Sequence, residues 1–188
     1  NGQIDLTEGV LIARGGIDIT TGLSHDLDFI APYGSPTITP YTTVITELAQ
    51  THNVSIDEAE VIVKSTLQVQ GQSLSIDSNL FSDNFIERLQ EADFDAAIAN
   101  TALMQIHQTA RLLASSLTGS TGDARLAGTS VFQSIATQLH ENNAVSLADT
   151  ITIAEILDRA AASFGMTIDV DLRNEVIDVV AAANVALE

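Results

Sequence analysis

The residues best placed to do chemistry in this sequence lie at its beginning, where amide and carboxyl side chains alternate. A calcium loop of the EF-hand type has oxygen ligands at alternating positions, a glycine at position six and a glutamate at position twelve. Setting Asn1 at position five places Gly2 at position six and Glu8 at position twelve. The ligand positions between them, seven and nine, are then Gln3 and Asp5.

This match covers only the second half of a calcium loop, because positions one and three fall before the first residue. Half a loop lacks the negative charge needed to hold the ion, so we predict a polar turn here rather than a metal site. In a longer parent chain that supplies the first half, we predict that Asn1, Gln3, Asp5 and Glu8 bind Ca²⁺. Calcium is the one cofactor that the sequence suggests.

Carboxylates gather at four further places: Asp26/Asp28, Asp83, Glu91/Asp93/Asp95 and Asp169/Asp171. Paired carboxylates can hydrolyse glycosides. That chemistry normally comes with an aromatic sugar cleft, whereas this chain has no tryptophan and only 4% aromatic residues. We therefore interpret the clusters as charges at helix starts on a solvated acidic face. Cation binding by Glu91–Asp95 is the alternative.

Histidine, serine and glycine motifs give no second chemistry. No two of the four histidines have helical ligand spacing, so we predict that they face solvent or cap helices: His25, His52, His107 and His140. Ser120 and Ser130 lack the G-x-S-x-G elbow of a serine nucleophile. The turn Gly119–Gly122 lacks the lysine of a phosphate-binding loop. We predict that the chain is not an enzyme.

The charge balance limits the classes of partner that the chain can bind. Seven Lys and Arg residues against 25 Asp and Glu give a net charge of −18, which repels nucleic acid. No run of 18 or more apolar residues occurs, so we predict no membrane insertion. The absence of cysteine excludes disulfides and thiolate catalysis.

The first 36 residues predict a β-like arm or hairpin. Val10–Ala13 reads as a strand, and Ile17–Thr20 is a short alternating segment between turn signals. Pro32 and Pro36 then enforce an irregular connection to the rest of the chain.

Residues 37–188 predict a bundle of about six helices, so the fold class is mostly α. Thr39 can cap a helix with Pro40 at its first position. Ser55 and Glu58 form a capping box, S-x-x-E, that opens the next helix. Further apolar periods of three and four continue to the last residues. Residues 71–84 read as a loop, in which three apolar side chains are expected to point inward: Leu74, Ile76 and Leu80.

Three short motifs are similar to a pattern that recurs in other proteins. They are Gly15-Gly16-Ile17-Asp18 with Thr21-Gly22, then Ile38-Thr39-Pro40-Tyr41-Thr42-Thr43, then Asp57-Glu58-Ala59-Glu60. Over roughly its first third the chain resembles a recurring segment of large bacterial surface and secreted proteins of the adhesin and matrix type. Tyr41 stands where that pattern has leucine. The resemblance implies a structural module that is secreted or displayed on the cell surface.

Three functions remain open. The first is a non-catalytic structural or adhesion module of a secreted or cell-surface bacterial protein. The second is a subunit of an extracellular filament that polymerises through its N-terminal arm, because an arm of this kind can complete a neighbour's sheet. The third is a helical ligand-binding domain. The expected partners are other copies of the chain or neighbouring domains of a longer chain.

Overall fold

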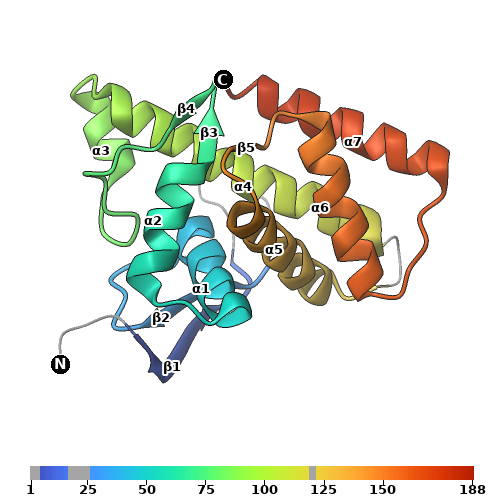
Figure 1. Ribbon diagram of the computed structural model, residues 1–188, viewed down its shortest axis with the longest axis horizontal. Helices are drawn as coiled ribbons and strands as arrows, with labels where there is room; N and C mark the ends of the chain where they lie inside the picture. The colour runs from blue at the N-terminus through green and yellow to red at the C-terminus, as the bar shows by residue number, and fades with distance from the viewer. Residues whose placement is uncertain (1–4, 17–25, 119–121) are drawn as a thin grey trace.

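The computed structural model describes residues 5–16, 26–118 and 122–188 (Figure 1). It confirms the mostly α fold: the part of the chain that the structure describes is 61% helical, in seven helices, and a short antiparallel hairpin lies at the N-terminus. The elements follow in the order β1 (Asp5–Ala13), β2 (Phe29–Tyr33), α1 (Pro40–His52), α2 (Ile56–Thr66), β3 (Leu67–Val69), β4 (Gln72–Ser73), α3 (Phe85–Gln90), α4 (Phe94–Thr118), α5 (Ala124–Glu141), β5 (Val145–Ser146), α6 (Thr150–Ser163) and α7 (Val170–Val185).

Helix α1 is the most completely buried helix of the described chain. It begins as its sequence predicts: Thr39 accepts a hydrogen bond from the Thr42 N–H, and the Thr42 side chain accepts one from the Thr39 N–H. Ten consecutive residues, from Pro40 to Ala49, are buried. A helix buried all round must be covered on every side, and α1 packs against α5, α2, α4 and β2.

Small residues let the long helices approach closely around α1. On α4 five alanines are almost completely buried: Ala96, Ala99, Ala102, Ala110 and Ala114. The two largest fully buried side chains are Tyr41 on α1 and Phe132 on α5. The Tyr41 hydroxyl donates a hydrogen bond of 2.5 Å to the Ala99 carbonyl oxygen, and burial raises the pKa of Tyr41 well above its usual value. Tyr41 therefore ties α1 to α4 by a polar contact inside an apolar core.

Helix α7 is docked on α4 through amide groups. The Asn184 side-chain amide donates to the Thr109 hydroxyl at 2.8 Å and to the Leu147 carbonyl oxygen at 2.6 Å. The Gln105 side-chain amide donates in turn to the Asn184 carbonyl oxygen at 3.1 Å. Both Gln105 and Asn184 are fully buried. In Figure 1 α7 lies at the opposite end of the view from β1.

A second, small sheet with the order β4-β3-β5 joins the end of α2 to the loop between α5 and α6. Strand β4 lies within residues 71–84, which the sequence predicted to be a loop throughout. In the rest of that loop Leu74 and Leu80 are buried as expected. The inward orientation predicted for Ile76 is wrong, since 76% of this residue is exposed. Its carbonyl oxygen, rather than its side chain, faces the bundle and accepts a hydrogen bond from Lys64 Nζ at 3.4 Å.

Replacing Tyr41 with phenylalanine tests the polar tie between α1 and α4. We expect Tyr41→Phe to lower the free energy of unfolding by about 1 kcal/mol, because one buried hydrogen bond is lost without a change of shape. Urea denaturation gives this difference. Tyr33→Phe is the matched control: Tyr33 is 52% exposed, so its variant should stay within about 0.5 kcal/mol of the wild type. Equal effects of the two substitutions would contradict the role of the Tyr41 hydroxyl.

Candidate functional site

The hairpin is attached to the bundle by hydroxyl groups from the first turn of α1. The Ile30 N–H of β2 donates to Thr43 Oγ1 at 3.0 Å, and Thr42 Oγ1 donates to the Ile30 carbonyl oxygen at 2.9 Å. Both threonines are buried. The N–H and C=O of one strand residue point to the same side of the strand. Ile30 therefore directs both groups towards α1 and away from β1.

The register of the hairpin leaves the other side of β1 open. Ile12 lies opposite Ile30, and Val10 lies opposite Pro32. Because Ile30 does not bond to β1, Ile12 and Val10 belong to the non-hydrogen-bonded pairs of the ladder, and their own N–H and C=O groups point away from β2. Pro32, which has no N–H, fits such a position without loss.

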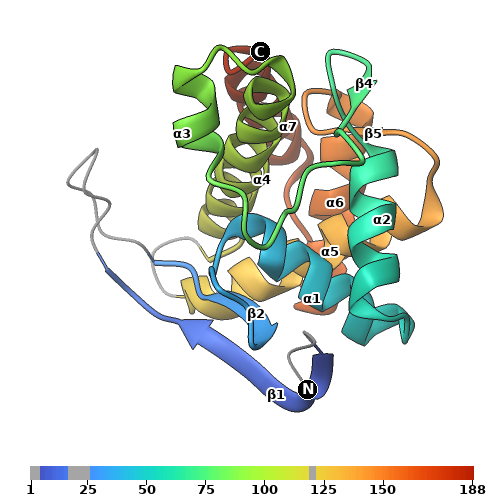
Figure 2. The ribbon, with the colours of Figure 1, turned by 90° about the vertical axis from the view of Figure 1, so that its left-hand side faces the viewer.

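We call this side, with the outward N–H and C=O groups of Val10 and Ile12, the outer edge of β1. The sheet contains β1 and β2 only, within the residues that the structure describes. Figure 2 shows β1 on the outside of the molecule, beyond β2 and α1. Ile12 is also 47% exposed. An unpaired strand edge with an exposed apolar side chain is a template for pairing with another chain.

The half calcium loop is placed only in part. Asn1 and Gln3 lie outside the described residues, while Asp5 and Glu8 belong to strand β1. Asp5 lies opposite Tyr33, and the pairing is irregular between Asp5 and Val10. The polar turn predicted here is wrong for Asp5 to Glu8, because the strand predicted at Val10–Ala13 already begins at Asp5. Binding of Ca²⁺ in a longer parent chain stays a prediction.

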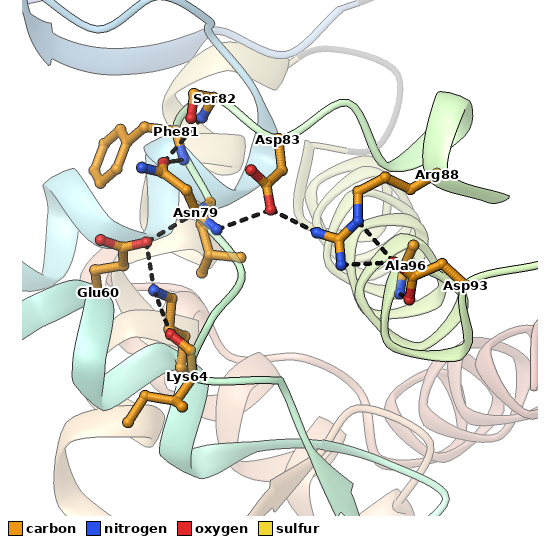
Figure 3. Close-up of polar contacts among 11 residues, drawn as sticks. Glu60, Lys64, Asn79, Phe81, Ser82, Asp83, Arg88, Asp93 and Ala96 are labelled. Carbon is orange, nitrogen blue, oxygen red and sulfur yellow. Dashed lines mark hydrogen bonds and ion pairs between the residues drawn. The ribbon is translucent and has the colours of Figure 1, made fainter. Parts of the chain in front are cut away.

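In the acidic segment Glu91–Asp95, our alternative cation site, the Asp93 carboxylate is bound by Arg88 and by the start of α4 (Figure 3). Arg88 lies between two carboxylates, with Nη1 2.7 Å from Asp83 and Nη2 2.8 Å from Asp93. Asp93 also accepts a hydrogen bond of 3.1 Å from the Ala96 N–H at the start of α4. This bond, followed by the one from Arg88, lowers the pKa of Asp93. Asp93 thus acts as a helix cap and as a partner of arginine.

A second ion pair fixes the preceding loop to α2. Glu60 and Lys64 lie 2.9 Å apart on successive turns, and Glu60 also accepts a hydrogen bond of 3.0 Å from the Leu80 N–H. On the other side of the loop, Asp83 accepts one from the Asn79 N–H at 2.9 Å (Figure 3). These polar groups hold loop backbone in place. Among the described residues, no group of three or more His, Asp or Glu side chains is arranged to hold a metal ion.

A groove of about 430 Å³ runs between α5 and α6. Its walls are polar, and they are formed by Gln138, Glu141, Asn142, Glu155, Asp158 and Arg159. The charged groups pair with one another or with α7: Arg159 lies 2.7 Å from Glu141, and Arg173 binds both oxygens of Asp158 at 2.7 and 2.6 Å. Gln138 donates to Glu155 across the groove. The groove therefore resembles a helix–helix contact with polar walls more than a prepared ligand site.

Two histidines meet beside this groove, a contact that sequence reasoning missed. His52 ends α1 and His140 lies in the last turn of α5, and their rings stack with centroids 4.0 Å apart and an angle of 23° between the planes. His52 Nε2 is buried without a hydrogen-bond partner. Burial lowers the pKa of His52, and the neighbouring His140 and Arg159 lower it further, while Glu141 opposes them. The two residues are far apart in sequence, so their spacing carried no signal.

Comparison of the chain with protein-family models, curated proteins and solved structures gave no match. In the described part of the chain, no helix has the length and apolar character needed to cross a bilayer.

The histidine pair predicts how stability responds to pH. The pKa of His52 is lower in the folded than in the unfolded chain, so the unfolded chain binds more protons between the two values. The free energy of unfolding should consequently fall as the pH drops through about 6.5, the ordinary pKa of histidine. His52→Gln should show a smaller fall than the wild type in urea denaturation at pH 7.5 and 5.5. An unchanged pH dependence in this variant would contradict the assignment.

Proposed function

We propose that this chain is a non-catalytic structural module of a secreted or cell-surface bacterial protein. The observation that carries the proposal is the role of the threonines in the motif that resembles bacterial surface proteins. Thr39 caps α1, and Thr42 and Thr43 bind the main chain of Ile30. The motif therefore joins a strand to a helix, which is an architectural task.

The charged side chains support the same conclusion. Five of the seven basic residues form ion pairs with acidic residues of the chain: Arg14, Lys64, Arg88, Arg159 and Arg173. These residues make six ion pairs. Five of the pairs join different elements or loops, and the sixth, Glu60–Lys64, lies within α2 and binds the main chain of the following loop. Basic groups that stabilise the module in this way leave an outer surface dominated by carboxylates, which favours solubility outside the cell and disfavours binding to phosphate backbones.

A second candidate is a subunit of an extracellular filament that assembles through its N-terminal arm. The outer edge of β1 favours it, because an open edge can accept a strand from another copy or from a neighbouring domain of a longer chain. The third possibility, a helical ligand-binding domain, has weaker support, since the charged walls of the α5–α6 groove already pair with each other or with α7.

Protease treatment of intact bacterial cells that express the parent protein tests the proposed location. Peptides of this chain should be released from intact cells and identified by mass spectrometry, together with those of known surface proteins. Release only after lysis would overturn the proposal of a surface or secreted module. A cytoplasmic protein followed in the same samples is the control for cell integrity.

Removing one hydroxyl tests the architectural role of the motif. Thr43→Val keeps the shape of the side chain but leaves the Ile30 N–H without its acceptor, and a buried unpaired donor costs about 1–3 kcal/mol. We expect that loss in urea denaturation, with faster hydrogen exchange at the Ile30 amide. Thr46→Val is the control, because the equally buried Thr46 hydroxyl bonds only within α1, to the Thr42 carbonyl oxygen. Unchanged exchange at Ile30 in Thr43→Val would contradict the role.

A further inference from the structure

We infer that the outer edge of β1 pairs with the same edge of a second copy, in antiparallel orientation, to form a closed dimer. The inference rests on the proposed role of the arm in association, and it identifies the partner as a second copy of the chain. The main-chain groups available for the contact are the N–H and C=O of Val10 and of Ile12, which the register of the hairpin turns away from β2.

The number of open strand edges in the molecule favours β1 of another copy as the partner. Strand β2 is covered by β1 on one side and by the threonines of α1 on the other. The outer strands of the second sheet, β4 and β5, have only two residues each. Among the described residues, β1 is thus the one strand of more than two residues with an open edge. A second copy can offer an equivalent edge with nothing else rearranged.

The charge of the arm also favours contact between copies there. The chain has a net charge of −18, so most faces of two copies repel each other. Residues 9–16 contain no acidic residue and a single basic one, Arg14. Arg14 binds Asp28 at 2.9 Å within its own hairpin. The two acidic residues of β1, Asp5 and Glu8, lie before this stretch. The paired part of the edge, from Val10 to Ile12, is therefore a place where two acidic molecules can approach with little direct repulsion.

One register suits the side chains best. With the two-fold axis at Leu11, Val10 lies opposite Ile12 of the second copy, and the relation repeats on the other side of the axis. Each of these two pairs exchanges two main-chain hydrogen bonds, and each joins an apolar residue to an apolar residue. A register centred on Ile12 would instead place Val10 opposite Arg14 of the second copy. We therefore place the axis at Leu11.

This pairing is isologous, since the same edge acts on both sides, and an isologous contact closes after two copies. Growth into a filament needs a further contact elsewhere. Pairing through β1 therefore predicts a dimer, whereas the filament hypothesis predicts polymers that grow through the arm.

Sedimentation velocity over a range of protein concentrations, at low and at high salt, tests the dimer. Salt screens the repulsion between the acidic copies, so the dimer fraction should rise with ionic strength. Ile12→Pro removes an outward N–H that the hairpin does not use, and it should weaken dimerisation by at least about tenfold. Ile12→Val keeps the N–H and a β-branched side chain, and it should dimerise like the wild type. Circular dichroism checks that both variants are folded.

A cysteine cross-link tests the register, because the chain has no cysteine of its own. In Leu11→Cys the two thiols face each other across the axis, at the roughly 4.5–5.5 Å Cβ separation of directly opposite residues. Oxidation should give a disulfide-linked dimer. In Ala13→Cys the thiols are four residues apart along the strands, roughly 14 Å, and no cross-link should form.

The outcomes decide between the inferences. A monomer under all conditions, or a dimer that Ile12→Pro leaves intact, overturns pairing through β1 and leaves the structural module to be judged by cell-surface proteolysis. Polymers that grow with concentration overturn the closed dimer and favour the filament. Equal cross-linking of both cysteine variants overturns the register.

Discussion

The arrangement of the whole N-terminal third depends on a requirement of the backbone: buried N–H and C=O groups need partners. Ile30 of β2 has both groups turned into the protein, and the hydroxyls of Thr42 and Thr43 receive them. Those threonines belong to the first turn of α1, the most completely buried helix, so the position of the strand is fixed by the position of the core. The same contact determines which groups of β1 face outward, since adjacent pairs in an antiparallel ladder alternate.

Polar side chains elsewhere serve the same end, the placement of backbone that forms no regular structure. Glu60 and Asp83 accept hydrogen bonds from main-chain N–H groups of the loop between β4 and α3. Each carboxylate is also paired with a basic side chain, Lys64 or Arg88. Two of the seven basic residues are thus used where a loop must be held against helices. The remaining acidic residues lie mainly on the outside.

The helical content could be predicted because it rests on local signals. The Thr39–Pro40 helix start, the Ser55 cap and the apolar periods of α4 to α7 are all readable from neighbouring residues, and the structure has them. Contacts between distant residues could not be predicted. The histidine stack joins the ends of two helices, and the strands β3, β4 and β5 are too short to show an alternating pattern. Ile76 was misplaced because a loop residue can turn its carbonyl inward as readily as its side chain.

The amides between α4 and α7 have a consequence for the uniqueness of the fold. The other buried residues of α7, Ile177, Val180 and Ala181, are aliphatic, and apolar contacts have no directional requirement, so they fix the alignment of two helices less strictly than hydrogen bonds do. Asn184 reaches Thr109 and Leu147, and Gln105 reaches the Asn184 backbone, in one alignment only. A slip of α7 would leave these buried amides without partners, at a cost of about 1–3 kcal/mol for each unpaired group. The hydrogen bonds of these amides therefore favour a single docking position of α7 on α4.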